Sequence, residues 1–144
     1  MIYTEMTKKA MMIAFQAHKN QTDKSGMPYI YHPIHLAEQM IDEESTCVAL
    51  LHDVVEDTDW TFEELAEQGF DGRIIEALKL MTHTEGVPYM EYVGRIKSNP
   101  IARTVKLADL RHNSDLTRLN EVNEKALERV EKYKNAIALL EEVK

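Results

Sequence analysis

Turn-forming residues and cysteine are scarce in this chain of 144 residues. It holds 5 glycines and 4 prolines, too little turn material for an all-β sandwich or barrel with many short strands. The single cysteine, Cys47, excludes an internal disulfide, and its apolar surroundings in the sequence predict a buried structural thiol. Such cysteine usage is typical of a reducing compartment, so we expect a cytoplasmic protein.

Long apolar runs and an excess of positive charge are also missing. No apolar run approaches the roughly 18 residues that span a membrane, and the N-terminal residues lack the pattern of a signal peptide. Lys and Arg together number 17 against 25 Asp and Glu, a net charge of −8. Nucleic-acid backbones are negatively charged and bind best to a basic protein surface. Neither nucleic acid nor a membrane is therefore an expected partner. The sequence predicts no oligomeric state.

Apolar residues recur at helical spacing along most of the chain, and no segment shows strand alternation. With a length that suits one domain, this periodicity predicts a single all-α domain over residues 1–144. A capping box of Thr61 and Glu64 marks one helix start. The predicted helices cover residues 4–19, 33–42, 44–58, 61–69, 74–81, 88–98, a segment that begins at residue 100, and 120–144.

Four ionisable residues crowd the end of the most apolar predicted helix: His52, Asp53, Glu56 and Asp57. Residues four apart share a helix face, and acids at a helix C-terminus oppose the helix dipole. A divalent cation would remove this repulsion, since His and Asp are good ligands. A solvated helix end with a hydrogen-bonded histidine explains the pattern equally well, so the local argument leaves both interpretations open.

Two distant residues extend this candidate site. His32 lies between Pro28 and Pro33 at a predicted loop-to-helix junction, and Asp109 follows an apolar run on a helix that we expect to be mostly buried. A buried, unpaired carboxylate is unfavourable, so Asp109 should have a partner. Together with His52 and Asp53, these residues would complete a metal site of two His and two Asp.

These motifs follow one another in the order of a known family. The chain resembles the HD-domain metal-dependent phosphohydrolases, and more narrowly the RelA/SpoT-type (p)ppGpp hydrolase domain and the stand-alone small alarmone hydrolases. The resemblance implies a compact multi-helix HD-domain bundle. It rests on the segments AHKNQ (17–21), KSGMPYIYHP (24–33), LLHDVVEDT (50–58) and VKLAD (105–109) with His112-Asn113.

The resemblance also implies a cofactor: one divalent ion, by family similarity Mn²⁺, held by His32, His52, Asp53 and Asp109. Mixed nitrogen and oxygen ligands also suit Fe²⁺, Co²⁺ and Zn²⁺, so the ligand types alone leave the metal open. A bound ion of this kind would polarise the phosphoryl group of a substrate.

Further roles follow from the same resemblance. Glu56 and Asp57 would orient or deprotonate the attacking water and handle the proton of the leaving oxygen. Lys24 would contact a substrate phosphate, and Asn113 would position the sugar or the metal ligands. A flexible surface lysine and a polar residue at a helix end are the alternatives for these last two. We expect His18 in the core, and His35, His83 and His112 at the surface or at element ends.

The sequence departs from the family pattern at two places that concern the substrate. The alarmone hydrolases carry an arginine that packs on the guanine base where this chain has Asp23, and the residues after Asn113 also differ. The expected activity is metal-dependent phosphohydrolysis of a small-molecule nucleotide, most specifically removal of the 3′-pyrophosphate of (p)ppGpp. The alternatives are a nucleoside monophosphate phosphatase and a non-catalytic nucleotide-binding module.

Overall fold

The computed structural model describes residues 1–142, and within them the chain forms helices, turns and one isolated antiparallel bridge between Thr22 and Pro28. This confirms the all-α prediction. Residues 143–144, the end of the predicted C-terminal helix, lie outside the described residues. Within the described part of the chain, no helix is long and apolar enough to cross a membrane.

The helices follow one another along the chain with short connections. They are α1 (Glu5–Ala17), α2 (Tyr31–Glu38), α3 (Glu43–Leu51), α4 (Val54–Asp57), α5 (Phe62–Glu67), α6 (Gly72–Met81), α7 (Tyr89–Ile96), α8 (Pro100–Asn113), the 3₁₀ turn η1 (Leu116–Arg118) and α9 (Glu124–Glu141).

Local sequence signals account for several helix ends. Thr61 and Glu64 form the predicted capping box at α5, in which each side chain binds the other residue's backbone N–H. Gly69 follows α5 with a φ of +95°, a backbone conformation that favours glycine. Pro100 is the first residue of α8, where its missing N–H leaves no helical hydrogen bond unmade.

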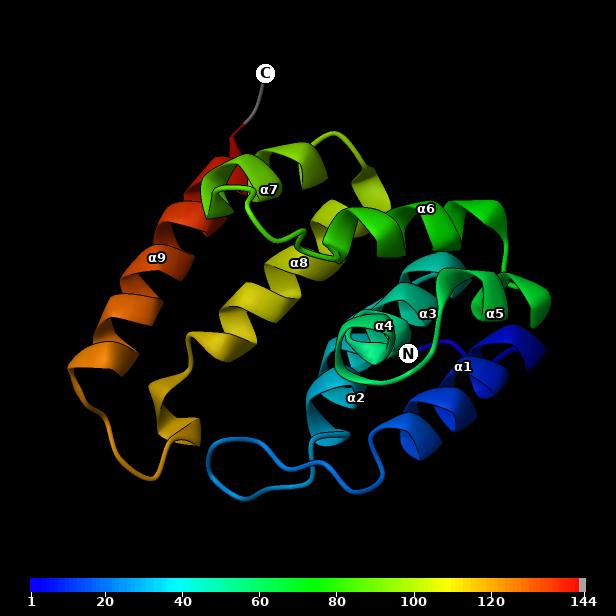
Figure 1. Cartoon of the computed structure of the whole chain (residues 1–144), viewed down its shortest axis with the longest axis horizontal. Helices are drawn as coiled ribbons and strands as arrows, with labels where there is room; N and C mark the ends of the chain where they lie inside the picture. The colour runs from blue at the N-terminus through cyan, green and yellow to red at the C-terminus, as the bar shows by residue number, and fades with distance from the viewer. Residues whose placement is uncertain (143–144) are drawn as a thin grey trace.

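Helix α3 forms the centre of the hydrophobic core. All of its residues from Ser45 to Leu51 are buried, and it contacts α1, α2, α6 and α8. Figure 1 shows α1 and α9 at opposite edges of the molecule, with α3 and α8 between them. Because α3 carries its apolar side chains into this core on every side, the end of α3 is held firmly against α2 and α8.

The long helix predicted over residues 44–58 is interrupted, which corrects that prediction. Helix α3 ends at Leu51, and α4 begins at Val54 after the turn at His52 and Asp53. In a continuous helix the carbonyl of Ala49 would accept the N–H of Asp53. The His52 ring takes that carbonyl instead, with Nδ1 at 2.7 Å. His52 and Asp53 therefore lie at a break in the helix.

Two other helix boundaries also differ from the prediction. Helix α2 begins at Tyr31, two residues before Pro33, and ends at Glu38 because the chain must become extended at Asp42, the N-cap of α3. Helix α9 begins at Glu124 rather than near residue 120, since the Asn123 side chain accepts the backbone N–H of Ala126 and caps the helix there.

Candidate metal centre and adjoining pocket

Three helix segments bring the predicted metal ligands together. His32 is the second residue of α2, His52 follows α3, and Asp109 lies in α8. All three are buried, and one potential ligand atom from each lies within 4.8 Å of the other two. His32 Nε2 is 2.8 Å and His52 Nε2 is 3.5 Å from Asp109 Oδ1. These atoms form a cluster of the size that a single ion can occupy.

His52 offers one nitrogen that no hydrogen bond uses. Its Nδ1 donates to the carbonyl of Ala49, and its buried Nε2 has no hydrogen-bond partner among the described residues. Asp53 Oδ2 lies 2.9 Å from Nε2, but out of line for a hydrogen bond. An unpaired buried nitrogen between two carboxylates is unfavourable by itself, and the donor set of imidazoles and carboxylates fits a divalent cation.

Asp109 has the partners that its burial requires. Lys106 Nζ lies 2.9 Å from Oδ2, and the Asn113 side-chain amide donates to Oδ1 at 3.1 Å. Burial favours the protonated acid, but the Lys106 charge and the close contacts with the rings of His32 and His52 hold the pKa of Asp109 well below its ordinary value. The carboxylate is therefore ionised, as a metal ligand must be.

Asp53 borders the cluster of His32, His52 and Asp109 but is not part of that group. Its Oδ2 accepts a hydrogen bond from the Tyr29 hydroxyl, which the loop before α2 brings to the site. Burial alone would raise the pKa of Asp53, but the adjacent His52 charge lowers it. The same ion pairing outweighs burial at His52 and raises its pKa well above the ordinary value. A cation bound at His52 Nε2 would compete with a proton for this nitrogen.

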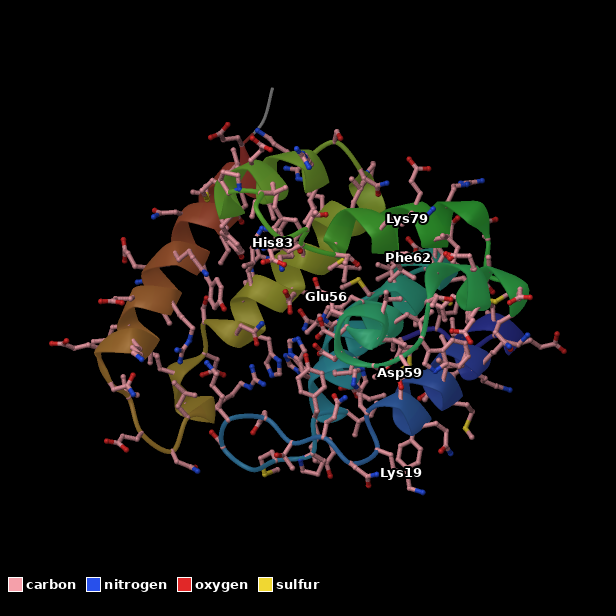
Figure 2. All side chains as sticks on the ribbon, in the orientation of Figure 1. Lys19, Glu56, Asp59, Phe62, Lys79 and His83 are labelled. Carbon is pink, nitrogen blue, oxygen red and sulfur yellow. The ribbon has the colours of Figure 1, made fainter. Side chains whose placement is uncertain are left out.

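Glu56 and Asp57 lie at the exposed rim of this cluster. Glu56 Oε1 accepts the backbone N–H of His83 at 2.8 Å, and Figure 2 shows these residues where the loop after α6 passes α4. Partial burial and the charge of Asp53 raise the pKa of both acids. Glu56 therefore also tethers a loop, a contact with a residue 27 positions away that local spacing does not signal.

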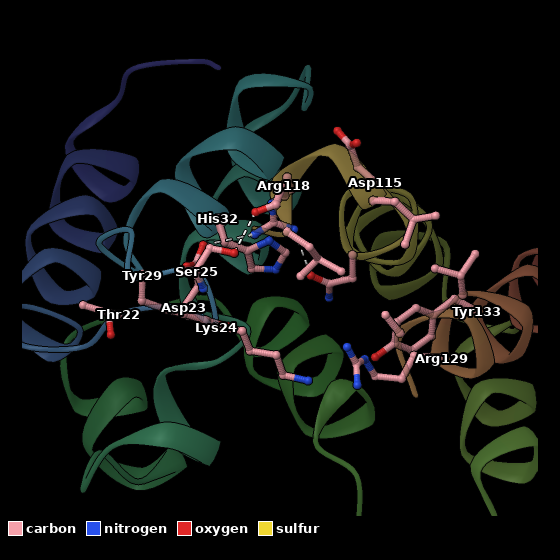
Figure 3. Close-up of a pocket in the computed structure, with 15 residues that line it drawn as sticks. Thr22, Asp23, Lys24, Ser25, Tyr29, His32, Asp115, Arg118, Arg129 and Tyr133 are labelled. Carbon is pink, nitrogen blue, oxygen red and sulfur yellow. Dashed lines mark hydrogen bonds and ion pairs between the residues drawn. The ribbon is translucent and has the colours of Figure 1, made fainter. Parts of the chain in front are cut away.

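A pocket adjoins the cluster and contains the two predicted substrate-binding residues. Its volume is about 340 Å³, and its lining includes His32, Tyr29, Lys24 and Asn113. Figure 3 shows the Lys24 and Arg129 side chains extending toward each other across this pocket. Two cations that approach one another across a cavity favour an anion between them.

Several residues of this region were absent from the sequence-based prediction. Tyr29 and Lys106 lie within the segments KSGMPYIYHP (24–33) and VKLAD (105–109) but had no predicted role there, and Arg129 lies in none of the family segments. Arg118 also lines the pocket, with Nη2 at 3.9 Å from Asp23 Oδ2. Asp23 Oδ1 accepts the backbone N–H groups of Ser25 and Met27, so this acid organises the loop and faces a cation from η1.

The remaining histidines divide into two groups. His18 is buried and its Nδ1 contacts Gln21 Oε1 at 2.8 Å, which confirms the prediction of a core histidine. His35 is exposed, and the His83 ring contacts the carbonyl of Val87 within the loop after α6. His112 lies in the last turn of α8 as expected, but its ring also contacts His32, which the sequence did not predict.

A family model and several known proteins match most of the chain. A family model described as "HD domain" matches residues 10–135. The guanosine-3′,5′-bis(diphosphate) 3′-pyrophosphohydrolase of Danio rerio is 35% identical, over 90% of this chain and 79% of the relative. A protein of the same description from Aquifex aeolicus is 37% identical over 60% of this chain but 13% of its own length.

Long bacterial relatives share this segment as one part of a larger protein. A probable GTP pyrophosphokinase of Mycobacterium leprae is 33% identical over 75% of this chain and 15% of its own length. The chain therefore spans a small fraction of these proteins. The match of the family model over residues 10–135 extends from α1 into α9 and includes the entire candidate metal cluster. The chain belongs to the HD domain family.

Proposed function

We propose that this chain is a metal-dependent phosphohydrolase that acts on a small-molecule nucleotide, most specifically a guanosine 3′,5′-bis(diphosphate) 3′-pyrophosphohydrolase. One observation carries the proposal: the His and Asp cluster opens through His32 into a pocket whose lining includes Lys24, Arg118 and Arg129. A pocket of about 340 Å³ lies at the lower end of the range for small-molecule sites. The named activities of the Danio rerio and Aquifex aeolicus relatives support the same substrate class.

The proposed ligands are His32, His52, Asp53 and Asp109, with Mn²⁺ as the ion that the family resemblance implies. When bound, a divalent ion would polarise the phosphoryl group and offset the negative charge of both the site and the substrate. A polyanionic substrate needs this compensation because the chain carries a net charge of −8. The site therefore depends on a cation to accept a polyanion.

The chain's own groups would complete the reaction. Hydrolysis adds water across the phosphorus–oxygen bond at the 3′ position, so one proton must leave the water and one must reach the departing oxygen. Asp57 and Glu56, at the exposed rim of the cluster, are the proposed proton carriers. Lys24 and Arg129 would hold the phosphates from opposite sides of the pocket, and Asn113 would orient the sugar.

The domain boundaries and the cellular location of the protein also belong to this proposal. A single HD domain over residues 1–144 and a cytoplasmic location both stay predictions from the sequence. The buried thiol of Cys47 is consistent with a reducing compartment.

The decisive experiment incubates the purified chain with Mn²⁺ and ppGpp and identifies the released product. We expect pyrophosphate, and we expect EDTA or the substitutions His52→Ala and Asp53→Ala to abolish its release. Orthophosphate released from nucleoside monophosphates instead would favour the phosphatase alternative. Tight nucleotide binding in a calorimeter with no product, across several metals and nucleotides, would overturn the enzymatic proposal in favour of a binding module.

A further inference from the structure

A histidine that binds a metal through Nε2 needs a partner for its other nitrogen. The partner accepts the Nδ1–H, which fixes both the tautomer and the orientation of the ring. His52 satisfies this requirement through the carbonyl of Ala49. For His32, whose Nε2 faces Asp109, the corresponding partner must be found among the groups around Nδ1.

His112 occupies that position. Its Nδ1 lies 2.7 Å from Nδ1 of His32, a distance at which one nitrogen must donate and the other accept. The two ring planes are inclined by only 5°, and the ring centroids are 5.0 Å apart, so the rings lie side by side and the contact runs along the ring plane. His32 itself is 3% exposed, which leaves little access for water to compete.

We propose that His112 is a positioning residue that accepts the Nδ1–H of His32 and thereby keeps Nε2 of His32 free to bind the metal ion. This inference rests on the metal site proposed above and adds a residue outside its ligand set. His112 would then carry its own proton on Nε2, because its Nδ1 is the acceptor. The acceptor is a neutral ring where a carboxylate or a backbone carbonyl is the usual partner.

The surroundings of His112 hold its ring in this orientation. Helix α8 supplies both Asp109 and His112, three residues apart and so on one face of the helix. The backbone carbonyl of His112 accepts a hydrogen bond from Arg118 Nη1 at 2.9 Å. The His35 ring covers one face of the His112 ring, with centroids 4.1 Å apart and planes inclined by 30°. Arg118 thus holds the backbone at His112, and His35 of α2 holds its ring.

The test is a calorimetric titration of the metal-free full chain with Mn²⁺ alone. His112→Phe keeps a flat ring beside His35 but removes the acceptor, and we expect it to weaken Mn²⁺ binding by about 10–100-fold, the range for lost outer partners of metal-binding histidines. His112→Asn can present an amide oxygen near the position of Nδ1, and we expect it to retain wild-type affinity within a few-fold. Arg111→Gln changes the exposed neighbour of His112 on α8, whose side chain pairs with Glu141, and is the matched control. We expect no change from it.

The outcomes separate this inference from the proposed function. Circular dichroism and thermal unfolding establish that each variant folds, and His112→Ala replaces His112→Phe if the latter does not. If the wild-type chain binds neither Mn²⁺ nor Co²⁺, the metal site itself is wrong and the inference fails with it. If the wild type binds but a folded variant without the acceptor binds equally well, only the role of His112 is wrong. Equal losses in His112→Phe and His112→Asn would also overturn the hydrogen-bond explanation.

Discussion

Lys106 and Asp109 form a buried ion pair at the base of the candidate metal centre, with Lys106 Nζ 2.9 Å from Asp109 Oδ2 and side chains only 12% and 8% exposed. Burial opposes the charge on Lys106, but Asp109 and the neighbouring Tyr92 raise its pKa above the ordinary value. The ammonium group is therefore charged in the interior, and it leaves Oδ1 of Asp109 to face the two histidines.

Asp109→Ala should strongly destabilise the metal-free protein, because it leaves the buried Lys106 charge without a partner. The expected loss is about 3–5 kcal/mol in the free energy of unfolding, the range for breaking a buried pair. Urea unfolding at neutral pH measures it. The control is Glu91→Ala, which breaks the exposed pair of Glu91 and Arg95 and should lose no more than about 1 kcal/mol. Similar losses from both substitutions would contradict the buried pair.

Leu50→Ala tests the central position of α3. Leu50 is fully buried, and truncating it leaves a cavity, so we expect unfolding to become easier by about 2–5 kcal/mol. Ile41→Ala removes a residue that is 91% exposed and should change stability by less than about 0.5 kcal/mol. Chemical unfolding of both variants gives the comparison, and a mild effect of Leu50→Ala would argue against α3 as the core helix.

The thiol of Cys47 should be unreactive in the folded protein. Burial, with smaller contributions from Glu43 and Glu44, raises the pKa of the thiol to about 12, and only the thiolate is a good nucleophile. A thiol reagent at pH 8 should therefore react with Cys47 only after a denaturant is added. Rapid labelling of the native chain would contradict the buried position.

The same shift predicts how stability depends on alkaline pH. Because the folded-state pKa of Cys47 lies above its unfolded value of 9.0, the contribution of this group is intact below pH 9.0 and is lost as the pH rises towards 12. Each pKa unit corresponds to about 1.4 kcal/mol. Between these pH values the wild type should lose more stability than Cys47→Ala, in which all other titrating groups remain. Parallel pH profiles of the two proteins would contradict this prediction.

Asp23 and Arg118 should change anion binding in opposite directions. Asp23→Asn retains an oxygen that can accept the Ser25 and Met27 N–H groups but removes a negative charge from the pocket, so pyrophosphate should bind more tightly. Arg118→Gln removes a positive charge and should weaken it. Each change is expected to reach about 1 kcal/mol at most, or about fivefold in affinity, because the pair is partly exposed. Calorimetry at low and high salt measures both, and effects that persist unchanged at high salt would contradict an electrostatic origin.

Features that depend on interactions between residues close in the sequence could be predicted from the sequence alone. Helical periodicity, the Thr61 and Glu64 capping box and Pro100 act over one or two turns, so the helix content and several helix starts could be predicted. Asp109 was expected to need a partner because a lone carboxylate following an apolar run cannot be buried unpaired. Its hydrogen bond from Asn113, one turn along α8, follows from the same helical spacing.

Contacts between distant segments were decided only by the tertiary structure. The ring of His32 contacts the ring of His112, which lies 80 positions later in the sequence. Glu56 accepts a hydrogen bond from the backbone of His83, 27 positions later. The packing of α2, α4 and α8 around α3 sets these distances. The interruption at His52 has a local cause, since its ring takes the Ala49 carbonyl where continued helix would have used it, but helical periodicity alone predicted an unbroken helix there. Residue types and their order show which side chains could bind a cation. The packing of the core sets which of their atoms meet and which neighbours hold them there.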